Sequence, residues 1–408
     1  MPKAKRPRRR SGKRSMLKWL IIGGGLQGTY LSRLLTHHLE ISAKELRVLD
    51  EHDEPLALWR HRTANCGMAH LRSPATHNID LGIMSLHHFV RDRGGPAAGD
   101  FIPPYYRPSL SLFNAHSQAV MAAGGLNALR LQGRARSAHP IDGGLCVETT
   151  AGDLCAERIL LALGLPAPCI PSWARSLGSR GAQVHHLFDP AFDRARIRGD
   201  RHRVLVVGGG ISAAQCALAL ARQVGPPVTL LARHPLAESQ FDFDPCWIGP
   251  KCLTDFHRQP YEGRRAIVDG ARLPGTLPAE VLTQLTLAVE EGRVRIFTGG
   301  VTSLSVGVGA IRLEAGGEPL EADRLILATG FDGGRPGGTL VDRLIDRFRL
   351  PTTPEGYPVV DRDLAWHPRI HVSGALAELM VGPCARNIVG VRNAGRLLLA
   401  GINAGMKK

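Results

Sequence analysis

WLIIGGGLQGTYLSRLL, residues 19–35, joins a short apolar run to a glycine-rich turn and then to an amphipathic segment. This order predicts a strand, a turn and a helix. Gly23, Gly25 and Gly28 have GxGxxG spacing, which allows a tight turn, close approach of a pyrophosphate and close packing of helix on strand. The helix start would present unpaired N–H groups and a positive dipole end to the phosphates. Taken alone the match is weak, because such turns also occur without a ligand.

An acidic residue follows this first turn at the distance expected for nucleotide binding. The apolar run LRVLD, residues 46–50, ends in Asp50, and Glu51 is the neighbouring candidate. A carboxylate at this place bonds a ribose hydroxyl in dinucleotide-binding units. The next segment, Trp59 to Leu81, has no clean period, so we expect an irregular stretch that packs on the cofactor, with Trp59 as a candidate contact.

A second stretch repeats the opening pattern. Residues 203–221, RVLVVGGGISAAQCALALA, predict an apolar strand, a GxGxxA turn and an alanine-rich helix. The candidate cofactor contacts in this second turn are Gly208, Gly210, Ser212 and Ala213.

The two units differ where the following strand ends. The run VTLLA leads to Arg233, at the place where the first unit carries an acid. An acid bonds both ribose hydroxyls, whereas an arginine suits a 2′-phosphate. The second unit therefore favours NADPH over NADH. Stacking of Arg233 on adenine and a solvated surface position are the alternatives.

Two glycine turns, one with a trailing acid and one with a trailing base, lie about 180 residues apart. Together they are far more specific than either alone, and they predict an α/β protein that binds two dinucleotides. The alternative is one functional site with one degenerate repeat.

The net charge of +15 is concentrated at the N-terminus. Residues 1–14 contain eight lysines and arginines and no acid, which leaves about +7 for the rest of the chain. We expect residues 1–15 to form a basic disordered tail, with nucleic-acid binding or targeting as the alternative. Arg8 to Arg10 superficially resemble a twin-arginine signal, but the apolar run after them is short and ends in the first glycine turn.

The composition is that of a soluble globular protein, with 44% hydrophobic and 21% charged residues over 408 positions. No apolar run reaches the roughly 20 residues of a membrane span. None of the eight cysteines forms CxxC, and no metal site is expected. We expect reduced, structural thiols in a cytoplasmic protein, with Cys246 and Cys252 as a redox pair in the minority interpretation.

Other segments predict the connections between these units. Helices are expected at 86–93, 110–123, 277–291 and 387–402, and an irregular, aromatic-rich loop at 239–256. The segment 369–378, RIHVSGALAE, predicts strand, turn and helix start, and RLILATG predicts a strand that ends at Thr329 and Gly330. Small residues and a glycine there let backbone approach a cofactor where the chain crosses between domains.

With these motifs the chain resembles the class B flavin monooxygenases, especially the lysine and ornithine N-hydroxylases. Beyond the two turns, the resemblance rests on DRLILATGFDGGRP, residues 323–336, and more loosely on VHHLFDPAF, where His185 or His186 with Phe188 correspond to a histidine and an aromatic. Arg335 stands where relatives have a histidine. The first turn lacks their proline, and residues 371–375, HVSGA, replace a common Gly-Asp.

The resemblance implies FAD on the first turn and NADPH on the second. It implies two Rossmann-like domains of the three-layer ββα type, with the NADPH domain inserted in the FAD domain. We expect residues 16–198 and 324–408 to form the FAD domain, and 199–323 the NAD(P)H domain. Gly374 and Ala375 join the candidate contacts, and a backbone N–H at the start of the terminal helix would face the pyrimidine end of the flavin.

The implied activity is a monooxygenation. NADPH reduces FAD, oxygen adds to form a flavin C4a-hydroperoxide, and a soft nucleophile of a small molecule, an amine nitrogen or a sulfur, is oxygenated. An enclosed site must exclude water. Its catalytic residues are not fixed by the sequence; the candidates are Arg72, Ser239, Phe241, Asp242 and Asp244.

Two other functions remain open at this point. One is a disulfide or quinone reductase on the same frame, which Cys246 with Cys252, or Cys384, would serve. The other is a non-catalytic nucleotide sensor tethered by its basic tail. We expect no membrane partner and nucleic-acid contact only through the tail, and an oligomer stays open.

Overall fold

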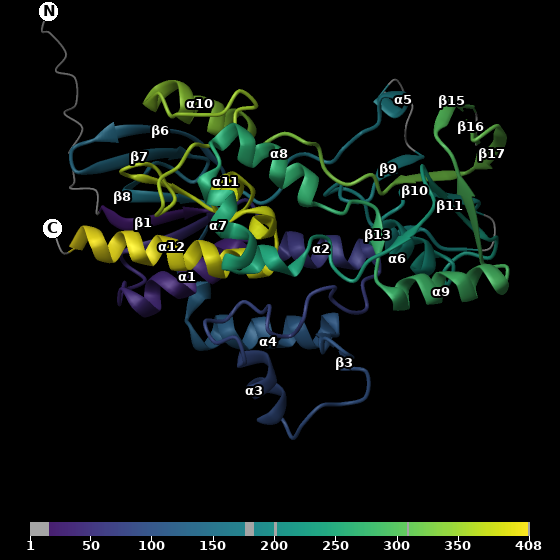
Figure 1. Ribbon diagram of the computed structural model, residues 1–408, viewed down its shortest axis with the longest axis horizontal. Coiled ribbons are helices and arrows are strands. Elements are labelled where there is room, and N and C mark those ends of the chain that lie inside the picture. Colours follow the sequence, from purple (N-terminus) through teal and green to yellow (C-terminus); the bar gives the residue numbers. More distant parts are fainter. Residues whose placement is uncertain (1–15, 176–182, 200–201, 308–309, 407–408) are drawn as a thin grey trace, which may run out of the picture.

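A computed structural model describes residues 16–175, 183–199, 202–307 and 310–406. They form two lobes side by side, each built on a sheet with parallel strands at its centre (Figure 1). The predicted basic tail lies outside the described residues.

The first sheet has eight strands. β1 lies in the middle and pairs in parallel with β2 on one side and β8 on the other. The antiparallel pair β6–β7 adds to β8, which gives the extra β-layer of the predicted three-layer domain. In order along the sheet the strands are β19 (Ala365–His367), β20 (Ile370–Val372), β8 (Leu154–Leu161), β1 (Leu17–Ile22), β2 (Leu46–Asp50) and β5 (Arg130–Gln132), with β6 (Ala135–Ile141) and β7 (Gly144–Thr149) beside β8.

Helices cover this sheet on both faces. On one side lie α1 (Leu26–His38), α4 (Leu110–Ala123) and α12 (Ile388–Met406), and on the other α10 (Gly338–Phe348) lies over β6 (Figure 1). The core fills with apolar side chains because both faces of β1 are covered; Trp19 and Ile21 face one cluster, Leu20 and Ile22 the other.

The second sheet has five parallel strands. Their order is β14 (Val294–Thr298), β11 (Val228–Ala232), β10 (Val204–Val207), β18 (Arg324–Leu327) and β9 (Val184–His186). The helices α6 (Ile211–Leu220) and α9 (Ala279–Glu290) pack together beside it, and the three-stranded sheet β15 (Val301–Val306), β16 (Ile311–Ala315) and β17 (Glu318–Ala322) forms the other layer. The prediction of two Rossmann-like domains is confirmed by this architecture.

The exact domain division stays a prediction. Two strands assigned from the sequence to the first domain, β9 and β18, hydrogen-bond within the second sheet. We propose that the second lobe therefore begins before Val184 and ends after Leu327.

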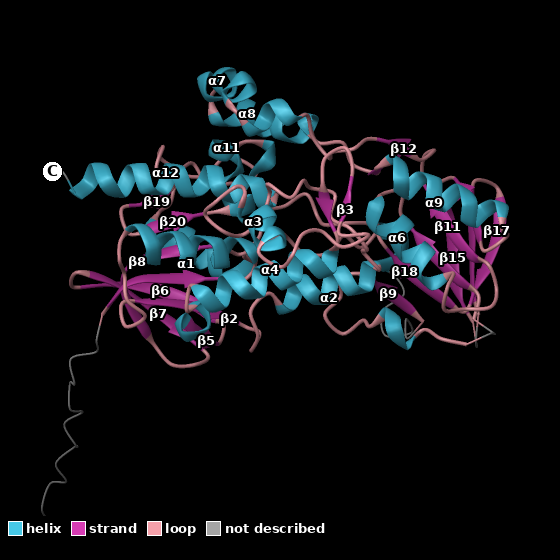
Figure 2. Cartoon of the chain, turned by 90° about the horizontal axis from the view of Figure 1, so that it is seen from below, coloured by secondary structure: helices cyan, strands magenta, loops and turns pink. Residues whose placement is uncertain are grey.

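Two stretches expected to be irregular contain helices. The segment after Asp50 forms α2 (Ala57–Cys66), whose buried residues Thr63 and Asn65 are polar and so leave no apolar period to read. The predicted 239–256 loop contains the 3₁₀ helix η4 (Pro245–Ile248) and most of α7 (Pro250–Arg258), which is followed by α8 (Tyr261–Ala271). In Figure 2, α7 and α8 lie beside α11 (Glu378–Val381) of the first lobe, away from the second sheet.

Smaller elements complete the connections. They are α3 (Ser85–Arg91), α5 (Ser172–Arg175), the strand pairs β3 (Phe101–Ile102) with β4 (Arg107–Pro108) and β12 (Ala237–Glu238) with β13 (Thr276–Leu277), and the 3₁₀ helices η1 (Leu126–Leu129), η3 (Arg194–Arg196), η5 (Gly374–Ala377) and η6 (Pro383–Arg386). Among the described residues, no helix combines the length and the apolar character needed to cross a bilayer.

Candidate functional site

The first glycine turn leaves the carboxyl end of β1 and enters α1. Gly23 has φ +107°, and a Cβ there would collide with the carbonyl of Ala162 at the end of β8. A Cβ on Gly28 would collide with the carbonyl of Gly23. Gly25 meets no described atom within 4 Å of its Cβ position, so the turn is closed on the sheet side and open beside Gly25. This is the shape a pyrophosphate needs.

Asp50 is bound to the turn itself. Its carboxylate accepts hydrogen bonds from the backbone N–H groups of Gly24, at 2.5 Å, and His52, at 2.9 Å. Each oxygen keeps a second lone pair for a ribose hydroxyl. Glu51 instead pairs with Arg134 at the surface, at 2.8 Å.

Arg130 lies next to Asp50 and was missed by the sequence analysis. It begins β5, donates to the carbonyl of His52 at 3.1 Å, and has a buried Nε with no partner among the described residues. Burial lowers its pKa, while Asp50 opposes that shift. A lone arginine at the start of a strand has no distinguishing pattern, so no sequence signal marked it.

Trp59 lies farther along, on α2. Its Nε1 donates to Asn114 Oδ1 at 3.0 Å and its ring packs on Phe113, so it ties α2 to α4.

The second glycine turn has the same construction. Gly208 has φ +154°, and a Cβ there would collide with the carbonyl of Ala328. Ala213 is fully buried in α6, and Gly210 precedes that helix. Ser212 interacts with the thiol of Cys66 on α2, whose pKa is raised to about 11 by burial. The start of α6 is therefore placed against α2.

Arg233 follows β11 and is exposed. Among the described residues it has no hydrogen-bond or ion-pair partner. Its guanidinium is available to an anion at the edge of the second turn, which is the position a 2′-phosphate requires.

The ATG stretch and the HHLF stretch meet after β18 and β9. Phe331 stacks on Phe188 at 5.0 Å with nearly parallel rings, and the guanidinium of Arg62 from α2 lies over Phe331 at 5.0 Å. Thr329 Oγ1 donates to the carbonyl of Cys169 at 2.6 Å, and Gly330 has φ +77°. The two sequence stretches singled out by the resemblance thus form one contact between the lobes.

His185 and His186 both lie on β9. Burial lowers the pKa of His186 to about 4, and its Nε2 is buried without a partner among the described residues. His186 is therefore neutral at pH 7 and packs beside Phe188 at 5.8 Å, while His185 stacks on Phe192.

The end of the chain returns to the first turn. Gly374 has φ +65° and a Cβ there would face the side chain of Gln27; Ala375 beside it is buried. Gln27 accepts a hydrogen bond from Ser373 at 2.7 Å and donates to the carbonyls of Ala385 and Asn387. One side chain of the glycine turn therefore fixes the segment that leads into α12.

Most of the catalytic candidates have structural partners. Arg72 donates to the carbonyls of Ser239 and Gln240, both at 2.8 Å, and to Thr276 Oγ1 at 2.9 Å, so it holds the crossing between the lobes. Ser239 Oγ donates to the carbonyl of Phe241. Asp244 accepts from the N–H of Cys246 and caps η4.

Phe241 and Asp242 face different partners. The ring of Phe241 meets Tyr105 edge to face at 5.1 Å, while the carboxylate of Asp242 accepts from the amide of Asn387. A cavity of about 660 Å³ lies along this loop, and Ser239, Phe241, Asp244 and Trp247 line it with Ile267 of α8.

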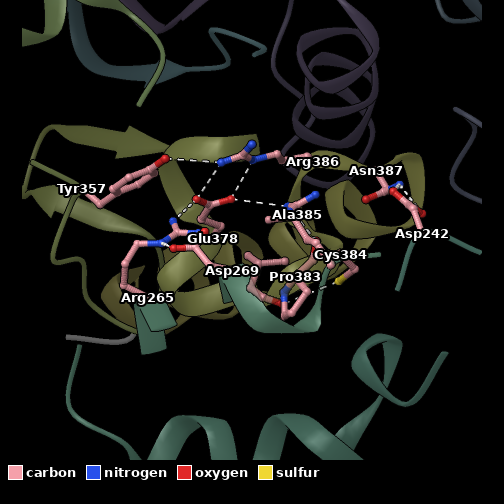
Figure 3. A network of polar contacts seen from close by, with 12 residues as sticks. Asp242, Arg265, Asp269, Tyr357, Glu378, Pro383, Cys384, Ala385, Arg386 and Asn387 are labelled. Carbon is pink, nitrogen blue, oxygen red and sulfur yellow. Dashed lines mark hydrogen bonds and ion pairs between the residues drawn. The ribbon is translucent and has the colours of Figure 1, made fainter. Parts of the chain in front are cut away.

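A buried charge network anchors α8 on the first lobe, and the sequence analysis missed it. Glu378 is fully buried, and its carboxylate binds Arg265 of α8 and Arg386 of η6 (Figure 3). A third arginine, Arg272 just after α8, also pairs with it. Arg386 is bidentate, at 2.8 and 2.9 Å, and Arg265 also pairs with Asp269. Arg265 and Glu378 lie 113 positions apart in the chain, so no local pattern marked them.

The expectation of reduced thiols is wrong for one pair. Cys246 and Cys252 form a disulfide between η4 and α7, and the other six cysteines are thiols. The two residues lie six positions apart, and the turn between η4 and α7 brings their Cα atoms to 5.4 Å.

The fold and paired turns define the class first: proteins with two Rossmann-type dinucleotide-binding domains. Over residues 135–286 the chain also matches the family model described as L-lysine 6-monooxygenase/L-ornithine 5-monooxygenase. No curated protein sequence matches it.

Solved structures align over nearly the whole chain. An FAD-bound cadaverine monooxygenase of desferrioxamine biosynthesis from Erwinia amylovora has a TM-score of 0.73 at 16% identity, covering 96% of this chain and 95% of that one. An ornithine hydroxylase from Pseudomonas aeruginosa has a TM-score of 0.76 at 14% identity, with 96% and 100% covered. An ornithine N-hydroxylase from Kutzneria sp. 744, with reduced FAD, NADP⁺ and L-ornithine, has 0.75 at 15%, with 96% and 100% covered. The resemblance to the lysine and ornithine N-hydroxylases is confirmed, and the reductase and sensor alternatives are not favoured.

Proposed function

We propose that this protein is an FAD-dependent monooxygenase that uses NADPH and O2 to hydroxylate the nitrogen of a small primary amine. The observation that carries the proposal is the pair of glycine turns, each at the carboxyl end of a central parallel strand. Asp50 is fixed beside one turn, and Arg233 beside the other has no partner among the described residues. Ligands of doubly wound sheets bind at such strand ends.

The residues present fit the two cofactors. The open space beside Gly25 admits a pyrophosphate, and Asp50 with Arg130 would hold the adenosine end of FAD. Gly208 and Gly210 would approach the pyrophosphate of NADPH, and Arg233 its 2′-phosphate. Bound FAD supplies electron transfer and oxygen activation.

The overall reaction consumes one amine, one O2, one NADPH and one proton, and gives a hydroxylamine, water and NADP⁺. The nitrogen needs its lone pair, so the substrate amine must lose a proton before it is oxygenated. The chain's task is to bind the amine beside the flavin and keep bulk water away. The contact of Arg62 with Phe331 and Phe188 joins the lobes for this purpose, and the network around Glu378 fixes α8 on the first lobe.

Product analysis tests the proposal. Purified protein should carry FAD, and NADPH oxidation should rise on addition of lysine, ornithine or cadaverine, with hydroxylamine formed in proportion to the NADPH consumed. If every amine leaves the NADPH rate unchanged and all the oxygen consumed appears as hydrogen peroxide, the hydroxylase proposal fails.

We also propose a cytoplasmic location, because the composition is that of a soluble globular protein. The Cys246–Cys252 disulfide is unusual for that compartment, so cell fractionation is an informative test. If the basic tail binds nucleic acid, deletion of residues 1–14 should abolish nucleic-acid binding. Sedimentation would show whether the protein forms an oligomer.

A further inference from the structure

Asn387 immediately precedes α12, and its side-chain oxygen is a buried acceptor that receives no hydrogen bond from the described residues. Its Nδ2 donates to the two carboxylate oxygens of Asp242, at 3.2 and 3.4 Å. Its side-chain Oδ1 is buried and has no hydrogen-bond partner among the described residues. An unsatisfied buried acceptor costs free energy, so it calls for a ligand.

Asp242 determines which way the amide of Asn387 faces. An ionised carboxylate only accepts hydrogen bonds, so the amide nitrogen must face it and the amide oxygen must face away. Figure 3 shows the carboxylate of Asp242 on the nitrogen side of Asn387. The carboxylate of Asp242 also interacts electrostatically with the guanidinium groups of Arg72 and Arg272. Burial lowers the pKa of both arginines, and the negative charge of Asp242 acts in the opposite direction and raises it. A substrate ammonium is therefore not needed to balance its charge.

The backbone of Asn387 is fixed from the other side by the first glycine turn. Gln27 donates to its carbonyl at 3.4 Å and to that of Ala385 at 3.0 Å. Arg386, the residue just before Asn387, is held by Glu378, so the segment that leads into Asn387 is anchored. Asn387 therefore lies directly before the first unpaired N–H groups of α12, and its backbone contacts Gln27 of the predicted FAD turn.

The pyrimidine edge of a flavin matches this arrangement. It carries a carbonyl oxygen, which accepts from N–H groups at a helix start, and next to it the N3–H group, which donates. Hydrogen bonds and charge at these ring positions tune the potential of a flavin.

We propose that Asn387 accepts the N3–H of the flavin through Oδ1, and that Asp242 is a positioning residue that orients this amide. The proposal rests on FAD binding to the first lobe, as the proposed function requires. Asp242 then serves to orient a flavin-binding side chain and does not bind the amine substrate. The loop that carries Asp242 between the lobes is thereby linked to the flavin ring through Asn387.

Three variants and a control test the proposal on apoprotein titrated with FAD. Asn387→Ala should weaken FAD binding about five- to tenfold, the value of one hydrogen bond at a buried acceptor. Asp242→Asn should weaken FAD binding less than Asn387→Ala does. An amide at position 242 can donate as well as accept, so the Asn387 amide can rotate by 180° and its Oδ1 points away from the flavin only part of the time. Asp255→Asn, at an exposed aspartate of α7 that pairs with Arg258, should leave FAD binding unchanged.

The third variant, the exchanged pair Asp242→Asn with Asn387→Asp, separates positioning from mere packing. The new amide at position 242 would donate to one oxygen of the new carboxylate at position 387 and leave the other oxygen for N3–H. FAD affinity should therefore recover to within about twofold of the wild type. The new negative charge beside the pyrimidine edge should lower the midpoint potential of the bound flavin. A structural role alone predicts recovery without that change in potential.

Several outcomes overturn the proposal. They are unchanged FAD affinity and potential in Asn387→Ala, or an exchanged pair whose potential equals that of the wild type. If Asn387→Ala does not fold, the isosteric variant Asp242→Asn provides the test. An altered flavin spectrum or midpoint potential in that variant supports the proposal, and an unaltered spectrum and potential contradict it. Wild-type protein that binds no FAD would refute the proposed function as well, whereas FAD binding that ignores Asn387 refutes this inference alone.

Discussion

Asp50 and Arg233 occupy equivalent places in the two glycine-turn units, and their surroundings differ as much as their charges. Asp50 is fixed by two backbone N–H groups, so it holds its own turn together before any ligand arrives. Arg233 has no partner within the described residues, so its full charge is available to a ligand. The first turn is thus preorganised by its acid, and the second depends on its base only when the dinucleotide binds.

Replacing Arg233 should change the choice of nicotinamide cofactor. Arg233→Gln removes a charged donor from the 2′-phosphate of NADPH but takes nothing from NADH. The ratio of kcat/KM for NADPH to that for NADH should fall about 10- to 100-fold, the value of a hydrogen bond to a charged group. Arg295→Gln, at another exposed arginine in the same sheet, is the matched control and should keep the ratio. An unchanged ratio in Arg233→Gln would leave Arg233 as a solvated surface residue.

At the scale of elements, α8 is held on the first lobe by polar anchors. Arg264 donates to the carbonyls of Leu379 and His257, and Arg265 and Arg272 bind Glu378. His257 of α7 contacts the carbonyl of Met380 at 2.7 Å. Apart from the bond between Arg264 and His257, these contacts converge on α11, and the buried carboxylate of Glu378 makes the charged ones.

Glu378→Gln should destabilise this docking. It leaves three arginines without their shared counter-charge, and breaking a buried ion pair from one side costs about 3 kcal/mol or more. Thermal unfolding should shift down by several degrees. The control Asp269→Asn removes the solvent-exposed partner of Arg265 and should change the midpoint by no more than a degree or two. Equal midpoints for Glu378→Gln and the wild type would show that α8 is held by apolar packing instead.

The elements that could be predicted from the sequence are those whose structure is determined by residues close together in the chain. The glycine turns follow from spacing, and the predicted 110–123 helix coincides with α4, whose Ser109 caps it. The helices α2 and α8 could not be predicted this way, since they bury Thr63 and Asn65, and Arg264 and Arg265, instead of an apolar stripe. The candidate site divides along the same line: glycines and strand-end charges are visible in sequence, whereas Asn387, Glu378 and Arg130 gain their roles only from distant partners.

On the scale of the whole molecule, buried imidazoles make stability depend on pH. Burial lowers the pKa of His77, His116, His186 and His371 to about 4 each, from an ordinary value of 6.5. The unfolded chain takes up these protons between pH 6.5 and 4 and the folded chain does not. Three of these residues lie in the first lobe and one in the second, so both lobes lose stability together as pH falls.

The thermal midpoint should therefore be level above about pH 7 and fall steadily from pH 6.5 towards pH 4. At pH 5 each histidine costs up to about 2 kcal/mol. His371→Phe should make the curve shallower, because the remaining buried histidines then act alone, while the exposed His37→Gln should reproduce the wild-type curve. A midpoint that stays constant down to pH 4.5 would show that these rings are solvated in the native state.

The bond between Gln27 and the segment before α12 has a consequence for biosynthesis. The two partners lie 358 positions apart, and β20 enters the first sheet only near the end of translation. The five strands of the second sheet all lie before residue 328 in the sequence. The second lobe can therefore fold while the rest of the chain is still being translated. The proposed flavin site closes last, so we expect FAD to bind after the chain leaves the ribosome. A chain cut before Asn387 should keep a folded second lobe but purify without the yellow colour of FAD.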